Sequence, residues 1–160
     1  MSSDIKVIKL PADFARWDEP LALILRAFAY MDGLIDPPSS AQRLTGDSLR
    51  EKARQETGFL AMRDNEVVGC IFAAEHSAHF YVGKLAVEPG LQGKKIGRRL
   101  MESVEALARA TGKPVLELQA RIELTDNQAA FGRLGFIETE RTAHPGYNRP
   151  TSVTMRKTLS

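Results

Sequence analysis

The stretch that decides the fold runs from residue 84 to residue 100 and reads Lys-Leu-Ala-Val-Glu-Pro-Gly-Leu-Gln-Gly-Lys-Lys-Ile-Gly-Arg-Arg-Leu. Its first part is apolar and stops at Pro89-Gly90, which is typical of the end of a strand. Its last part opens an amphipathic helix, because apolar residues recur every three or four positions from Ile96 to Leu107. The sequence therefore predicts a strand, a glycine-rich basic turn and a helix in direct succession.

The turn between that strand and that helix has the features of a phosphate site. The first N–H groups of a helix have no partner within the helix, and the helix dipole adds about half a positive charge there. Gly93 and Gly97 leave room for a phosphate, and Lys94, Lys95 and Arg98 add positive charge. The glycine spacing matches neither the dinucleotide-binding fingerprint nor the nucleoside-triphosphate loop. On composition alone, a solvated basic helix start is an equally good interpretation.

The flanking sequence extends this pattern to an α/β domain. Strands are predicted at 5–9, 58–62, 67–75, 80–87 and 115–119, with a closing antiparallel pair at 136–142 and 151–157. Helices are predicted at about 18–32, 46–57, 96–112 and 126–134, with Asp47 capping the second and Thr125 or Asp126 capping the fourth. The order β-α-α-β-β-β-α-β-α-β-β predicts a mixed, mostly antiparallel central sheet with helices on both faces.

Length and composition limit the classes of function. The 160 residues fit one domain spanning 1–160, and 43% apolar with 26% charged residues is typical of a soluble globular protein. Lys and Arg number 22 and Asp and Glu 20, so a net charge of +2 argues against a nucleic-acid or membrane partner. The single cysteine, Cys70, excludes an intrachain disulfide, and three scattered histidines predict no metal site. The N-terminus lacks the pattern of a signal peptide, so we expect a cytoplasmic protein.

Two segments carry a family resemblance. Gln92-Gly-Lys-Lys-Ile-Gly97, after a strand ending Leu-Ala-Val-Glu-Pro, resembles the acyl-CoA loop of the GNAT family of N-acetyltransferases, whose usual form is Arg/Gln-x-x-Gly-x-Gly/Ala. Asn127-Gln-Ala-Ala-Phe-Gly-Arg-Leu-Gly-Phe136 resembles the second half of the same signature. The resemblance spans residues 5–157 and is most specific within 80–137. It implies the acyl-CoA N-acyltransferase fold and transfer of acetyl from acetyl-CoA to a primary amine of a small-molecule or amino-acid-like acceptor.

The resemblance also implies which residues hold acetyl-CoA, with a backbone N–H near Leu85 facing the thioester carbonyl. These residues are Leu85, Ala86, Val87, Gln92, Gly93, Lys94, Lys95, Ile96, Gly97, Arg98, Asn127 and Phe131. Lys95 stands where the family usually has a glycine, and Phe131 stands where it frequently has a tyrosine. Because phenylalanine has no hydroxyl, a non-catalytic acetyl-CoA-binding regulatory domain stays open as an alternative. A nucleic-acid-binding module using the basic patch at 94–99 is a third hypothesis, which the low net charge disfavours.

Acetyl transfer to an amine makes three chemical demands. The amine must be neutral, the thioester oxygen needs a donor as it becomes negative, and the departing thiolate benefits from a proton. Candidate bases cluster around the Ser77–Ala78 turn, where Glu75 and His79 are predicted, and His76, Tyr81 and Glu117 are further options.

The remaining candidate acid is Tyr147, in the loop His144–Pro150. Acceptor contacts are expected from this loop, the first helices and the loop Met31–Ser40, because loops on a fixed scaffold carry specificity. The side chains of Tyr30, Asp32, Asp36 and Tyr147 would suit a cationic amine. The sequence leaves open whether the protein forms a homodimer.

Overall fold

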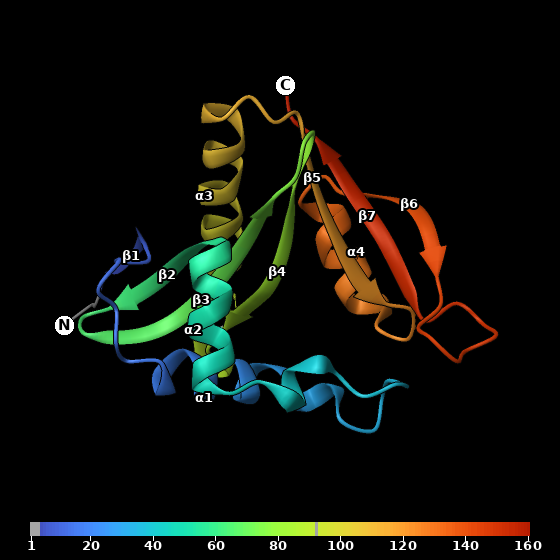
Figure 1. Cartoon of the computed structure of the whole chain (residues 1–160), viewed down its shortest axis with the longest axis horizontal. Helices are drawn as coiled ribbons and strands as arrows, with labels where there is room; N and C mark the ends of the chain where they lie inside the picture. Colours follow the sequence, from blue (N-terminus) through green and yellow to red (C-terminus); the bar gives the residue numbers. More distant parts are fainter. Residues whose placement is uncertain (1–3, 92) are drawn as a thin grey trace.

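Seven strands of the computed structural model, which describes residues 4–91 and 93–160, form one sheet in the order β1-β2-β3-β4-β5-β7-β6 (Figure 1). Among the strands of the described residues, only β4 and β5 pair in parallel, and the other neighbours are antiparallel. The strands are β1 (Ile5–Lys9), β2 (Thr57–Arg63), β3 (Glu66–Glu75), β4 (His79–Val87), β5 (Val115–Arg121), β6 (Ile137–Thr142) and β7 (Ser152–Thr158). The predicted mixed, mostly antiparallel sheet and the predicted order of helices and strands along the chain are confirmed.

Helices cover both faces of the sheet, as predicted (Figure 1). One buried cluster joins α3 and the α4 side of the sheet, and the other joins α1 and α2 to the opposite face. The α-helices are α1 (Asp18–Phe28), α2 (Gly46–Gln55), α3 (Ile96–Ala110) and α4 (Thr125–Arg133), and short 3-10 helices occur at Ala29–Met31, Ser40–Arg43 and Pro89–Leu91. The predicted acyl-CoA loop leads directly into α3, whose apolar side chains belong to the first of these clusters.

Two predicted helix caps differ from the structure. Thr45 caps α2, because its side chain accepts a hydrogen bond from the N–H of Ser48 while the Ser48 hydroxyl accepts one from the N–H of Thr45. Thr45 and Ser48 therefore form the cap that was predicted at Asp47, and Asp47 lies in the first turn of α2. In α4, Thr125 and Asp126 also lie inside the first turn. The negative charge of Asp126 there interacts favourably with the helix dipole.

The parallel pair β4 and β5 is joined at one end only. The ladder pairs His79 to Tyr81 with Val115 to Glu117, and β4 then runs on to Val87 without further pairing to β5. β5 stays paired with β7 from Val115 to Arg121, and β4 stays paired with β3. Because each strand is held by its other neighbour, the two diverge and leave backbone groups of β4 facing an open space.

A bulge interrupts β4 next to this opening. Cys70 of β3 pairs with Ala86 and Phe72 pairs with Gly83, so Lys84 and Leu85 together oppose one residue of β3. Lys84 has a φ of 52°, in the left-handed region, and this allows the strand to accommodate the extra residue. Leu85 packs on the α3 side of the sheet, and the side chain of Lys84 reaches Ser40 on the α1–α2 side. The bulge therefore directs two consecutive side chains to opposite faces.

The contact between the sheet and α3 is tight at Gly69, which yields a stability prediction. A Cβ there would lie 3.0 Å from Cδ1 of Leu100 and 3.1 Å from Cβ of Ala61. We expect Gly69→Ala to lower the free energy of unfolding by about 1–3 kcal/mol, because overpacking forces neighbours apart. Urea unfolding measures this difference. Gly90→Ala is the matched control, since no atom lies within 4 Å of its added Cβ, and equal stability of the two variants would contradict the prediction.

Candidate active site

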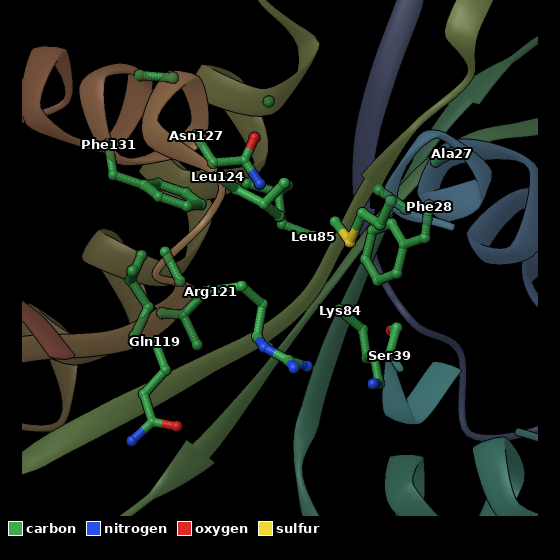
Figure 2. Close-up of a pocket in the computed structure, with 18 of the residues that line it drawn as sticks. Ala27, Phe28, Ser39, Lys84, Leu85, Gln119, Arg121, Leu124, Asn127 and Phe131 are labelled. Carbon is green, nitrogen blue, oxygen red and sulfur yellow. The ribbon is translucent and has the colours of Figure 1, made fainter. Parts of the chain in front are cut away.

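A cavity of about 1080 Å³ fills the opening between β4 and β5 (Figure 2). Its walls come from the separated parts of the two strands, the start of α3, one side of α4 and two loops. One loop joins α1 to α2, and the other joins β6 to β7. Residues far apart in the sequence thus face one partly open cavity.

The predicted acyl-CoA loop forms one end of the cavity. Gly93, Lys95, Ile96, Gly97 and Arg98 line it. Lys95 is the N-cap of α3 and has a φ of 61°, a backbone conformation that explains why a glycine suits this position in the family. A lysine side chain has no hydrogen-bond acceptor, so it cannot cap the first N–H groups of α3, and these can donate to an anion.

Two residues of the predicted loop are placed differently. The side chain of Lys94 is exposed and does not line the cavity. Gln92 lies outside the described residues.

The predicted strand segment and helix residues form the middle of the cavity. Leu85, Ala86 and Val87 line the wall made by β4. Asn127 and Phe131 line the opposite wall from α4, and Figure 2 shows both side chains on that side. The amide oxygen of Asn127 accepts a hydrogen bond of 3.1 Å from the Tyr30 hydroxyl. The structure therefore brings these predicted residues together around the unpaired edge of β4, a backbone surface that an extended chain of amides can join.

Cys70 supports the bulge from the neighbouring strand. Its thiol is fully buried and donates to the carbonyl oxygen of Lys84 at 3.4 Å. Burial raises the pKa of this thiol to about 12, against a smaller lowering by a hydrogen bond from the Ala86 backbone. The side chain therefore stays protonated at neutral pH and connects to the backbone on both sides of Leu85.

The predicted bases lie elsewhere. Glu75 is exposed and forms an ion pair of 3.4 Å with Lys113. Nε2 of His79 lies 3.8 Å from a carboxylate oxygen of Glu117, which also pairs with Arg156 at 2.6 Å. Both residues belong to the end of the sheet where β4 and β5 still pair, and neither is among the residues that line the cavity. Their assignment as bases stays a prediction from the sequence.

The two loops meet over the cavity through Asp36. The Tyr147 hydroxyl donates to Oδ1 of Asp36 at 2.6 Å, and Arg149 lies 3.2 Å from Oδ2. This hydrogen bond to the carboxylate is the main reason that the pKa of Tyr147 is raised. Tyr147 therefore lines the cavity, as an acid would, while its proton is directed to Asp36 in the structure.

The sequence interpretation missed three side chains of the cavity, namely Lys84, Arg121 and His144. Burial and the nearby Arg121 guanidinium lower the pKa of His144, so its ring is neutral at pH 7. Lys84 gave a signal in the sequence, because it interrupts an otherwise apolar strand. The signal for Arg121 is only its place at the end of a strand, which is where α/β folds often bind ligands.

A comparison with known protein families agrees with this geometry. Residues 23–136 match the acetyltransferase (GNAT) family. The chain belongs to the GNAT family of acetyltransferases. As a GNAT enzyme it is an acetyl-CoA-dependent N-acetyltransferase, which confirms the predicted activity and acyl donor.

Two GNAT relatives are similar over most of this chain. An "IAA acetyltransferase" of Azospirillum brasilense is 29% identical over 153 residues, which cover 88% of this chain and 99% of the relative. An "Aminoglycoside N(6')-acetyltransferase type 1" of Stenotrophomonas maltophilia is 28% identical over 157 residues, covering 84% and 86%. The names of these two relatives point to different acceptors.

Solved structures share the fold. A PaiA N-acetyltransferase of Thermoplasma acidophilum in complex with coenzyme A matches with a TM-score of 0.81 and 15% identity, over 98% of this chain and 99% of that one. A GNAT acetyltransferase of Elizabethkingia anophelis with acetyl-CoA bound matches with a TM-score of 0.69 and 18% identity, over 97% and 98%. At these identities the likeness shows the fold alone.

Among residues 4–91 and 93–160, no group of three or more His, Cys, Asp or Glu side chains is placed to hold a metal ion. No helix in this part of the GNAT chain combines the length and the apolar character needed to cross a membrane.

The buried thiol of Cys70 yields a prediction on stability and pH. An unfolded thiol ionises near pH 8.5, while the folded pKa is about 12, so stability is fully present below about pH 8.5 and is lost as pH rises toward 12. We expect wild type to lose about 1–2 kcal/mol more than Cys70→Ala between pH 7.5 and pH 10, as unfolding then releases a proton. Urea unfolding of both proteins at both pH values measures this. Parallel losses would contradict the assignment of this pKa.

Proposed function

We propose that this GNAT enzyme acetylates a primary amine of a small-molecule or amino-acid-like acceptor, by direct attack of the amine on the thioester of acetyl-CoA. The observation that carries the proposal is one continuous cavity, which reaches from the open start of α3, along the unpaired edge of β4, to the two loops. A donor and an acceptor held in one cavity react without a covalent enzyme intermediate, because positioning alone removes much of the barrier.

The α3 end of the cavity would hold the pyrophosphate. The N–H groups after Lys95 and the helix dipole favour a double negative charge, and Arg98 adds a side-chain cation. Lys94 is a further exposed cation near this loop.

The edge of β4 from Leu85 to Val87 would hold the amides of the pantetheine arm as a neighbouring strand does, with Asn127 and Phe131 across from it. A backbone N–H at Leu85 would donate to the thioester oxygen as that oxygen becomes negative. The Cys70 thiol helps to fix the bulge on which this donor depends.

Proton transfer is assigned to groups near the loops. Tyr147, the acid that the sequence suggested, lines the cavity, but its hydroxyl donates to Asp36 and joins the two loops. The neutral ring of His144, whose Nδ1 faces the Thr151 hydroxyl, is a base inside the cavity, unlike Glu75 and His79. Phe131 supplies no proton, so the departing thiolate takes its proton from another group or from water.

Gly97→Asp tests the pyrophosphate site. A Cβ at Gly97 has room, since its nearest neighbour, Cγ2 of Val87, lies 3.9 Å away, and an aspartate in a first helical turn favours the helix. We expect the fold to persist while affinity for CoA falls about a hundredfold or more, because two like charges would be juxtaposed. Calorimetry with CoA measures the affinity. The control Gly97→Ala adds only a methyl group and should lose less, whereas unchanged affinity of Gly97→Asp would contradict the site.

Tyr147→Phe separates two roles of this side chain. An acid role predicts a kcat lower by ~10²–10⁴ with unchanged CoA affinity. A role in joining the two loops predicts a higher KM for the acceptor, by about tenfold for a hydrogen bond to a carboxylate, at nearly unchanged kcat. We expect the second result, because the phenol already donates to Asp36 and its pKa is raised.

Asp36→Asn provides the matched variant for this test. If Tyr147 acts through Asp36, each single variant should raise the acceptor KM and the double variant should add little more. Additive effects of the two substitutions, or a loss confined to kcat, would contradict the joining role.

A further inference from the structure

The cavity carries charge of one sign. Its lining includes several Lys and Arg side chains, and none of the described residues that line it is an aspartate or a glutamate. The lining cations are Arg43, Lys52, Lys84, Lys95, Arg98, Arg121 and Arg133. The phosphates of CoA explain cations at the start of α3, but they do not explain the rest.

A second group of cations lies on the other face of the sheet. Lys84 bonds to Ser40 on the α1–α2 side, and a Cβ added at the neighbouring Gly83 would lie 3.9 Å from Nζ of Lys52. Arg121 reaches the carbonyl oxygen of Pro37, which lies in the loop between α1 and α2. These side chains therefore face the part of the cavity assigned to the acceptor, with the sheet between them and α3.

Among residues 4–91 and 93–160, no carboxylate forms an ion pair with the ammonium group of Lys84. Nζ donates to the Ser40 hydroxyl at 2.9 Å, which leaves further N–H donors of the ammonium for a ligand. Burial lowers its pKa, and the nearby cations Lys52 and Arg43 lower it further, outweighing Glu56. Glu56 itself is bound to Lys52 at 2.8 Å. A negative charge on a ligand would offset both the burial and the like-charge repulsion.

Arg121 faces Lys84 across the cavity. Figure 2 shows the two side chains pointing into the same space from β5 and β4. Within the described part of the chain, the buried Nε of Arg121 has no hydrogen-bond partner. The nearest carboxylates are engaged elsewhere, because Glu123 accepts from the N–H of Asp36 and the Asp36 side chain accepts from Tyr147 and Arg149. Besides the N–H that donates to the Pro37 carbonyl oxygen, the guanidinium keeps terminal N–H donors that a carboxylate can accept from.

We infer that the acceptor carries a carboxylate besides its amine, and that Arg121 and Lys84 bind this carboxylate from the two sides of the cavity. The inference rests on the proposed function and names its substrate class, namely amino acids rather than polyamines. The acidic loop residues that suggested a cationic acceptor are used otherwise, since Asp32 accepts from Gln42 at 2.9 Å and Asp36 joins the loops. A polycationic acceptor would meet several like charges at the cavity wall, and the nearby carboxylate of Asp36 is already bound to Tyr147 and Arg149.

The test compares acceptors in pairs that differ in one charge. The purified protein and acetyl-CoA are assayed with a panel of α-, β- and γ-amino acids and with the corresponding carboxamides, and kcat/KM is measured for each. We expect wild type to prefer the acids at least about tenfold, the effect of one charge-assisted contact. Spermidine, as a polyamine, should be a poor acceptor.

Variants assign the preference to the two side chains. Arg121→Gln and Lys84→Gln should each reduce the acid-over-amide ratio by about tenfold, while Lys84→Arg should retain it. Using the ratio separates carboxylate binding from any general effect on the reaction. Arg54→Gln, which removes an exposed cation of α2 with a 63% exposed side chain, is the control and should leave the ratio unchanged.

The outcomes distinguish this inference from the proposed function. Acetylation of amides or spermidine as fast as of acids, or a ratio that the variants leave unchanged, would overturn the inference and keep the acetyltransferase activity. Should no acceptor in the panel react, calorimetry with CoA-saturated protein compares an N-acetylated amino acid with its amide. Binding that depends on the carboxylate and is lost in Arg121→Gln supports the inference without turnover, and equal or no binding of both overturns it.

Discussion

The arrangement of the site depends on one constraint in the sheet, which is that two parallel neighbours pair at one end only. β4 is held along its length by β3, and β5 is held by β7, so the strands separate after Tyr81 without either losing its place. The separation exposes backbone groups that would otherwise be satisfied within the sheet. It also allows α3, α4 and two loops to border a single cavity.

The bulge at Lys84 and Leu85 gives this cavity two chemically different sides. Because two residues oppose one on β3, Leu85 packs toward α3 while the Lys84 side chain reaches the 3-10 helix Ser40–Arg43. The side toward α3 offers helix N–H groups and glycines, as an anionic donor requires. The side toward α1 and α2 offers half-buried cations, which makes charge on the acceptor a determinant of specificity.

Periodicity predicted α3 well, because the burial of its residues follows the helical repeat. Ile96, Leu100 and Val104 are all buried in α3, as their spacing predicts. The cap of α2 was missed because Thr45 and Ser48 satisfy each other, a reciprocal contact that outcompetes the nearby Asp47.

The candidate bases and the cationic residues of the cavity were harder to predict from the sequence. Glu75 and His79 are close to Tyr81 along the chain, but they flank the turn between β3 and β4, at the end where β4 and β5 still pair. Arg121 and Lys84 belong to different strands and face the same space only in the folded protein. Their neighbours in the sequence therefore do not predict that they lie together. The left-handed backbone of Lys84 likewise depends on its partner strand.

The buried cysteine has a consequence for a reaction whose product is a thiol. Every turnover of acetyl-CoA releases free CoA, which forms mixed disulfides with accessible protein thiolates under oxidising conditions. The only cysteine of this chain is Cys70, which is fully buried and stays protonated at neutral pH. The enzyme therefore offers no thiolate for its own product to modify, and reagents that count released thiols register CoA without a background from the folded protein.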